Sequence, residues 1–163
     1  MNRLVSAIVL TLSLGFCAST ANAQYTRDFP KGECTWFVYN IAKENGWTIY
    51  FSINSYRDAY KWWQIVTNAS YRSRTTSVPN SIMVIGRSIY TPYGHVAWVM
   101  EKSSDRWFVY HSNFRYGTLI CYVDGVPIYG TWLTRVPGTS YVVVGTNPYS
   151  GGKRYPLLGF LAR

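Results

Sequence analysis

A chain of 163 residues and 18.7 kDa is long enough for one domain with a hydrophobic core and too short for two typical domains. Its 16 lysines and arginines against 7 aspartates and glutamates give a formal charge of +9, and the basic residues are scattered along the chain. This distribution favours diffuse attraction to an anionic wall polymer or membrane surface. It disfavours specific nucleic-acid recognition, since the sequence also has no RNA-binding or zinc-finger pattern.

The first 23 residues have the pattern of a secretory signal peptide. Arg3 gives a positive amino-terminal region, residues 4–16 form an apolar run, and Ala-Asn-Ala at 21–23 matches a small-x-small cleavage site. The apolar run is shorter than a comfortable membrane span. We therefore expect export from a bacterial cell, to the periplasm or the exterior, and a single mature domain over residues 24–163.

Two helical patterns precede a series of strands. Apolar residues recur with a helical period over 34–45, where Asn-Gly supplies a stop, and a second helical pattern covers 55–66. From residue 81 onward, short β-branched or aromatic segments alternate with turn signals. We expect the Gly- and Pro-rich tail from residue 147 to add an edge strand or to pack across the sheet. Helices followed by antiparallel strands indicate an α+β fold with N-terminal helices packed on a sheet.

Cys34 stands at the start of the first predicted helix. The free N–H groups and partial positive charge of a helix N-terminus lower the pKa of a thiol and so favour the reactive thiolate. Two other roles are open for Cys34 in an exported chain: a disulfide with Cys121, or an inert place in the core. The residues available to act with the thiol distinguish among these three roles.

Both histidines of the chain lie at one end of a predicted hairpin. His95 begins a strand, and His111 is near the end of the next strand, across a turn at 103–106. Side-chain alternation along that strand places Asn113 on the same face as His111. Cys34, His95 and either His111 or Asn113 then form the nucleophile, base and orienting residue of a thiol hydrolase.

The order and spacing of these residues resemble the CHAP domain, the cysteine, histidine-dependent amidohydrolase/peptidase branch of the NlpC/P60 and papain-like peptidases. The similarity covers roughly residues 30–115 and rests on four blocks. They are Gly-x-Cys-Thr-Trp at 32–36, Pro-x-x-Ile-x-Val at 79–84, Gly-His-Val-Ala-x-Val at 94–99 and Asn-Phe at 113–114. The resemblance implies a papain-like fold, with helices packed on an antiparallel sheet or half-barrel.

By this resemblance, Cys34 is the nucleophile and His95 is the general base. The family usually has a glutamate at the position of His111, so this chain departs from the pattern, and the third member is either His111 or Asn113. Trp36, beside the nucleophile, and Tyr93 are candidate substrate contacts. The implied reaction is hydrolysis of peptidoglycan amide bonds through an acyl-enzyme, at the N-acetylmuramoyl–L-alanine bond or in the peptide stem or cross-bridge. No metal or other cofactor is implied.

The sequence leaves two functional hypotheses. The first is an exported cysteine amidase or endopeptidase with peptidoglycan as its substrate and an inhibitor or immunity protein as a conceivable partner. The second is a catalytically silent wall-binding or inhibitory protein with the same fold, acting through its basic, aromatic surface. Thiol reactivity separates them, because a low-pKa Cys34 is alkylated rapidly at about pH 6–7. The biological role is open: wall remodelling, an antibacterial toxin or a secretion apparatus.

Overall fold

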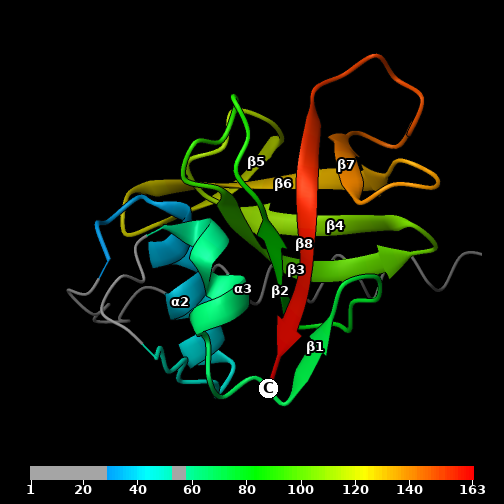
Figure 1. The fold of residues 1–163 in the computed structure, drawn as a ribbon. Coiled ribbons are helices and arrows are strands. Elements are labelled where there is room, and N and C mark those ends of the chain that lie inside the picture. The colour runs from blue at the N-terminus through cyan, green and yellow to red at the C-terminus, as the bar shows by residue number, and fades with distance from the viewer. Residues whose placement is uncertain (1–28, 53–57) are drawn as a thin grey trace, which may run out of the picture.

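The computed structural model of this protein describes residues 29–52 and 58–163 (Figure 1). The predicted signal peptide and its cleavage site lie outside the described residues, as does the first part of the second predicted helix. Within the described ranges, no helix is long and apolar enough to cross a membrane. These residues form an antiparallel β-structure with short helical segments beside it.

A closed antiparallel barrel forms the body of the protein. Six strands pair in a ring, which β8 closes by pairing with β2: β2 (Ser81–Ile85), β3 (His95–Ser103), β4 (Arg106–His111), β6 (Val126–Arg135), β7 (Tyr141–Val144) and β8 (Arg154–Ala162). Two further strands extend the ring. β1 (Tyr71–Ser73) pairs with β8, and β5 (Thr118–Val123) pairs with β6.

The closed ring corrects the predicted open sheet or half-barrel. β8 is not an edge strand, because it is hydrogen-bonded to β1, β2 and β7. Gly159 allows this close packing: its φ is 146°, and a Cβ atom there would lie 2.5 Å from the carbonyl oxygen of Ser73. Local alternation identifies a strand but not its partners, so the sequence pattern could not reveal the closure.

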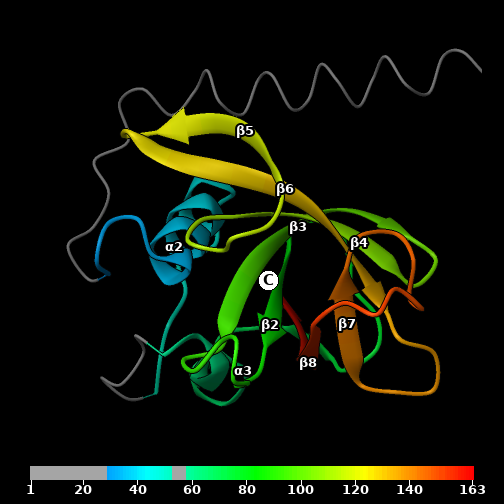
Figure 2. The same cartoon turned by 90° about the horizontal axis from the view of Figure 1, so that it is seen from above.

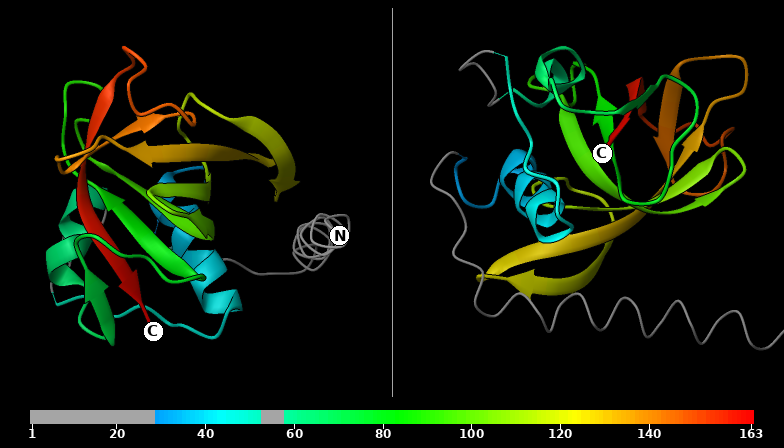
Figure 3. Two further views of the ribbon diagram at one scale, coloured as in Figure 1. Left: turned by 90° about the vertical axis from the view of Figure 1, so that its right-hand side faces the viewer. Right: turned by 90° about the horizontal axis from the view of Figure 1, so that it is seen from below.

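An 11-residue helix lies beside the barrel. α2 (Cys34–Glu44) starts at the predicted residue and ends one residue early, and it contacts β3 and β4. Figures 2 and 3 show α2 outside the barrel wall, on the side from which the β5–β6 pair projects. The second predicted helix is shorter than expected. Its described part consists of η2 (Ala59–Lys61) and α3 (Trp62–Ile65), and Val66 is already extended and bridges to Phe51.

Two apolar clusters lie on the two sides of the barrel wall. The side chains of β2 and β3 alternate between them: Met83 and Ala97 belong to one, and Ile82 and Val96 to the other. The cluster that contains Met83 and Ala97 has members from all six strands of the ring and therefore fills the barrel. The cluster that contains Ile82 and Val96 also includes residues of α2. Because both faces of the wall are covered, every residue of β2 is buried.

Candidate active site

The two histidines lie at one end of the barrel, on its inner face. His95 begins β3 two residues before Ala97, and His111 ends β4 two residues after Val109. Ala97 and Val109 both belong to the cluster inside the barrel, so the alternation of side chains places the histidines on the same face. Their ring centroids are 5.4 Å apart, with the ring planes at 75°. The β3–β4 hairpin thus brings the two imidazoles together.

Cys34 reaches the same end of the barrel from α2. It is the first residue of the helix and is only 8% exposed. Hydrogen bonds from the backbone N–H groups of Val96, Thr35 and Cys34 itself favour its thiolate. Since Val96 directly follows His95, the sulfur lies against the start of β3. Cys34, His95 and Asn113 line one pocket of about 430 Å³.

The glycine before His95 allows a close contact between η2 and β3. Gly94 has a φ of 71°, and a Cβ atom there would lie 2.6 Å from the Cβ of Tyr60 and 2.7 Å from the carbonyl oxygen of Ile85. The backbone N–H of Tyr60 also donates a hydrogen bond to the carbonyl oxygen of Tyr93, at 3.2 Å. A larger residue at position 94 would therefore displace the backbone that carries His95.

Burial outweighs the helix N-terminus in setting the protonation of Cys34. Desolvation, with a smaller contribution from the charge of Glu33, raises the pKa of the thiol to about 12, against the effect of the three backbone N–H groups. The expected low pKa is therefore wrong for this site. Burial, together with the nearby His111, holds the pKa of His95 well below its ordinary value. Both shifts favour a neutral thiol and a neutral imidazole over a thiolate–imidazolium pair.

His111 packs beside His95 and does not line the pocket. It is 1% exposed, and its ring centroid lies 5.2 Å from that of Phe114 and 6.2 Å from that of Tyr129. Both ring nitrogens of His111, and Nε2 of His95, are buried without a hydrogen-bond partner among the described residues. Unpartnered buried polar atoms cost free energy and call for an explanation in a native structure. A hydrogen bond between the two imidazoles would satisfy one atom on each.

Asn113 lies beyond the end of β4 and is bound to the residue before the cysteine. Its φ is 53°, so the alternation of the strand does not extend to it, and the predicted face shared with His111 is wrong. Its Nδ2 donates a hydrogen bond to Oε2 of Glu33 at 2.8 Å, and Oγ of Ser112 donates one to the carbonyl oxygen of Glu33 at 2.8 Å. These two bonds attach the loop after β4 to the N-terminus of α2.

The two candidate substrate contacts have different positions. Trp36 is 2% exposed, belongs to the core shared by α2 and the barrel wall, and is not among the residues that line the pocket. Its adjacency to Cys34 is misleading, because successive residues of a helix point in different directions. Tyr93 is 69% exposed and lines the pocket.

Several lining residues were not assigned a role in the site from the sequence: Glu33, Tyr90, Phe114, Arg115, Tyr116, Lys153 and Tyr155. Phe114 stacks on His95, with ring centroids 4.5 Å apart and planes at 23°. Glu33 and Phe114 each adjoin a residue that the sequence identified, so their positions offered a signal. Lys153 and Tyr155 come from the C-terminal tail and reach the pocket only because β8 closes the barrel.

Within the described residues, Cys34 takes part in neither a disulfide nor a metal-ligand cluster. Its thiol is free, so the alternative bond to Cys121 is not formed in this structure. Cys121 lies in β5 and is half-buried. In residues 29–52 and 58–163, no group of three or more His, Cys, Asp or Glu is placed to hold a metal ion.

Because its histidines are buried, the folded protein is expected to lose stability against unfolding in acid. Burial lowers the pKa of His111 from 6.5 to about 4, so between these values the unfolded chain binds a proton that the folded chain does not. Stability is therefore expected to fall as the pH drops from 6.5 to 4, with about 3 kcal/mol from His111 alone. Urea unfolding of the wild type and His111→Gln between pH 7 and 4 measures this contribution. Equal pH dependence in both proteins would contradict it.

The family model of the CHAP domain matches residues 24–113, more than half of the chain, so the chain belongs to the CHAP domain family. A search of the curated proteins found no match.

Solved structures that align with this chain include those of two proteins. An N-acetylmuramoyl-L-alanine amidase from Staphylococcus aureus aligns with a TM-score of 0.47 and 22% identity, over 86% of this chain and 33% of the amidase. Ly7917 aligns with a TM-score of 0.51 and 13% identity, over 81% of this chain and 53% of Ly7917. A structure of Ly7917 with the hydrolyzing product of MDP aligns with a TM-score of 0.42 and 14% identity, over 78% of this chain and 84% of that one. The chain thus spans a third of the amidase and about half of the first Ly7917 structure, and the likeness to that Ly7917 structure concerns the fold.

Proposed function

We propose that this protein is a cysteine hydrolase that cleaves amide bonds of bacterial peptidoglycan, at the N-acetylmuramoyl–L-alanine bond or within the stem or cross-bridge peptides. One observation carries the proposal: Cys34, at a helix N-terminus, and His95, at a strand start, line the same pocket. His111 packs against the ring of His95 and is not among the residues that line the pocket. Membership of the CHAP domain family supports the same chemistry.

The proposed reaction starts from the neutral pair. His95 accepts the thiol proton as Sγ of Cys34 attacks the substrate carbonyl carbon, and the resulting imidazolium then protonates the leaving amine. The acyl-enzyme is a thioester. His95 next takes a proton from a water molecule that attacks this thioester, which releases the carboxylic acid and restores the thiol. General-base catalysis by His95 replaces a preformed thiolate, because burial keeps the pKa of Cys34 high.

The N-terminus of α2 supplies the proposed oxyanion site. The backbone N–H groups of Cys34 and Thr35 belong to the first turn of the helix, where N–H groups have no partner within the helix. Both are close enough to the sulfur to stabilise its negative charge. The tetrahedral oxyanion would form next to the same sulfur, where these donors and the helix dipole favour negative charge.

His111 is the better candidate for the residue that orients His95. It contacts the His95 ring, whereas the amide nitrogen of Asn113 is hydrogen-bonded to Glu33. We expect His111→Ala to lower kcat about 10²- to 10⁴-fold and to alter the pH profile of kcat, because it leaves the ring of His95 without its neighbour. Asn113→Ala is expected to cost less than about tenfold, within the range of a single lost surface hydrogen bond.

Kinetics on a soluble muropeptide over a range of pH, with melting temperatures of both variants, measure the two effects. His111→Gln tests whether a hydrogen-bonding side chain restores part of the rate. A large loss of kcat in Asn113→Ala with little change in His111→Ala would reverse the two roles.

The remaining parts of the proposal concern the cellular setting. The chain is exported through a cleaved signal peptide at residues 1–23, and residues 24–163 act as one catalytic domain. The scattered positive charge of residues 24–163, +8 once Arg3 is removed with the signal peptide, supports contact with anionic wall polymers or a membrane surface. An inhibitor or immunity protein that covers the pocket is the expected partner if the hydrolase acts as a toxin.

A silent wall-binding protein is the second candidate, and the burial of Cys34 favours it. Cys34 is 8% exposed, and burial raises the pKa of its thiol to about 12, as in an inert core cysteine. Incubation of the purified protein with peptidoglycan sacculi, followed by mass spectrometry of the soluble fraction, separates the two candidates. Released fragments establish the hydrolase, and their masses identify the bond that is cut. Sedimentation of the protein with intact sacculi, without fragments, establishes the binding protein.

A further inference from the structure

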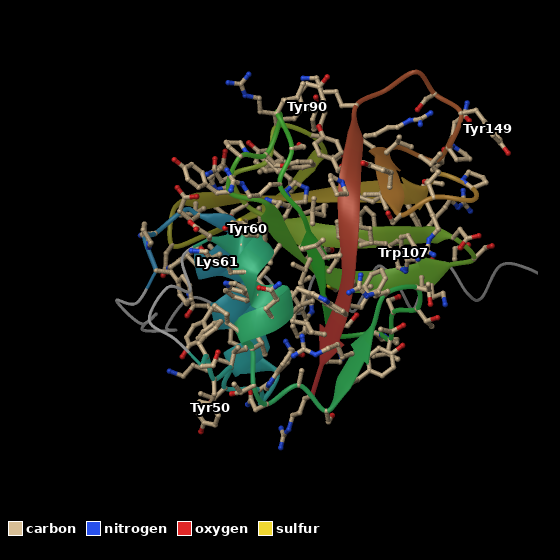
Figure 4. The ribbon with its side chains drawn as sticks, in the orientation of Figure 1. Tyr50, Tyr60, Lys61, Tyr90, Trp107 and Tyr149 are labelled. Atoms are coloured by element: carbon tan, nitrogen blue, oxygen red, sulfur yellow. The ribbon has the colours of Figure 1, made fainter. Side chains whose placement is uncertain are left out.

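The candidate active-site pocket has an aromatic wall that ends at a lysine. Starting from His95, successive ring centroids lie 4.5 Å apart (to Phe114), 5.4 Å (on to Tyr155) and 6.1 Å (on to Tyr90). Nζ of Lys153 lies over the Tyr90 ring, 4.5 Å from its centroid. Figure 4 shows Tyr90 at the end of the molecule where β8 begins, and Lys153 directly precedes that strand.

The ammonium group of Lys153, an exposed residue, interacts with two aromatic side chains of this wall. Besides the Tyr90 ring, it interacts with Tyr116: hydrogen bonds from Tyr155 and Lys153, with the charge of Lys153, lower the pKa of the Tyr116 phenol. Tyr155 is 1% exposed and is therefore a rigid support for Tyr116. A lysine fixed between an aromatic face and a phenol loses less side-chain entropy on binding a ligand than a free surface lysine.

The positive charge in this pocket exceeds the negative charge. Arg115 and Lys153 are the basic lining residues, and Glu33 is the acidic one. Oxygen Oε2 of Glu33 accepts a hydrogen bond from Asn113, on the loop after β4. Among the described residues, no ion pair joins Lys153 to a carboxylate. The pocket therefore offers a cation that no carboxylate of the described residues neutralises, and a complementary ligand group is an anion.

We propose that Lys153, held between Tyr90 and Tyr116, binds a carboxylate of the substrate peptide and makes the protein selective for stem peptides with a free carboxylate over those with a carboxamide. The inference rests on the proposed function. Three centroid-to-centroid distances of 4.5, 5.4 and 6.1 Å lead from the ring of His95 to that of Tyr90. An extended peptide advances about 3.4 Å per residue. The carboxylate therefore belongs to one of the first few residues beside the bond that is cut.

Two synthetic muropeptides that differ only in free or amidated stem carboxylates test this selectivity. The wild type is expected to cleave the free acid with a kcat/KM about ten- to a hundredfold higher, as for a hydrogen bond to a charged group, with the difference in KM. Lys153→Met should reduce this ratio to about one, and Lys153→Arg should retain most of it. Both variants are expected to fold, because residue 153 is exposed. Lys102→Met, an exposed lysine of β3 outside the pocket, is the matched control and should retain the wild-type ratio.

Binding of the same two muropeptides to Cys34→Ala and to Cys34→Ala/Lys153→Met, by calorimetry, gives a readout without turnover. Cleavage of both muropeptides at equal kcat/KM by the wild type overturns the selectivity and leaves the proposed hydrolase intact. Absence of cleavage overturns the hydrolase. In that case, tighter binding of the free acid that depends on Lys153 still supports the carboxylate site, and equal binding of both muropeptides rejects it.

Discussion

Replacing Cys34 with alanine is expected to lower the release of soluble fragments from peptidoglycan by at least about 10⁴-fold, because the variant lacks the thiol that we propose forms the acyl-enzyme. The fold should persist. The side chain is small and buried, and the loss of its sulfur costs about 1 kcal/mol, as is typical of a single substitution. Fragment release from sacculi, together with melting temperature and circular dichroism, measures both effects. Wild-type fragment release by a folded Cys34→Ala variant would remove Cys34 from the mechanism.

The rate at which the thiol is alkylated tests whether Cys34 is buried and protonated in the folded protein. Because the thiol is buried and its pKa is raised to about 12, we expect slow alkylation by iodoacetamide at pH 7 in the folded protein and rapid alkylation after unfolding. Cys34→Ala is the control that assigns the label to this residue. Rapid alkylation of the folded protein at pH 7 would show an accessible thiolate and restore the low pKa expected from the helix N-terminus.

The parts of the site that the sequence predicted are those set by local structure. A helix that begins at Cys34 follows from the apolar period and the Asn-Gly stop. A hairpin with His95 at one strand start and His111 at the partner's end follows from a turn between two short strands. The juxtaposition of these elements follows from neither pattern, and it was the family resemblance that joined them. The matched family model and the shared pocket agree with that interpretation.

The parts that the sequence did not predict depend on contacts between distant segments. The protonation of Cys34 is set by desolvation, which exists only once α2 packs on β3 and β4. The position of Asn113 depends on a left-handed residue after β4 and on its bond to Glu33, and strand alternation does not apply there. Lys153 joins the pocket through the closure of the barrel by β8. In each case the local sequence pattern identifies a helix or strand but not the contacts that it makes with distant segments of the chain.

Replacing His95 with alanine is expected to lower kcat about 10³- to 10⁶-fold near pH 7, the range seen when the base of a nucleophile–base pair is removed. The reason is specific to this site. A thiol with a pKa of about 12 has a thiolate fraction of only about 10⁻⁵ at pH 7, so without a neighbouring base almost no nucleophile is present.

The pH dependence of the His95→Ala variant gives the sharpest test of general-base catalysis. Its residual rate should rise about tenfold per pH unit between pH 7 and 9, because only the rare thiolate attacks and its population grows with hydroxide. The wild-type rate should be nearly flat there, since the pKa of His95 lies well below this range and the imidazole is already neutral. Added imidazole should restore part of the variant's activity, and Lys102→Met should follow the wild-type profile. A flat profile in His95→Ala would mean that another group accepts the thiol proton, and the role of base would pass from His95 to a different residue of the pocket.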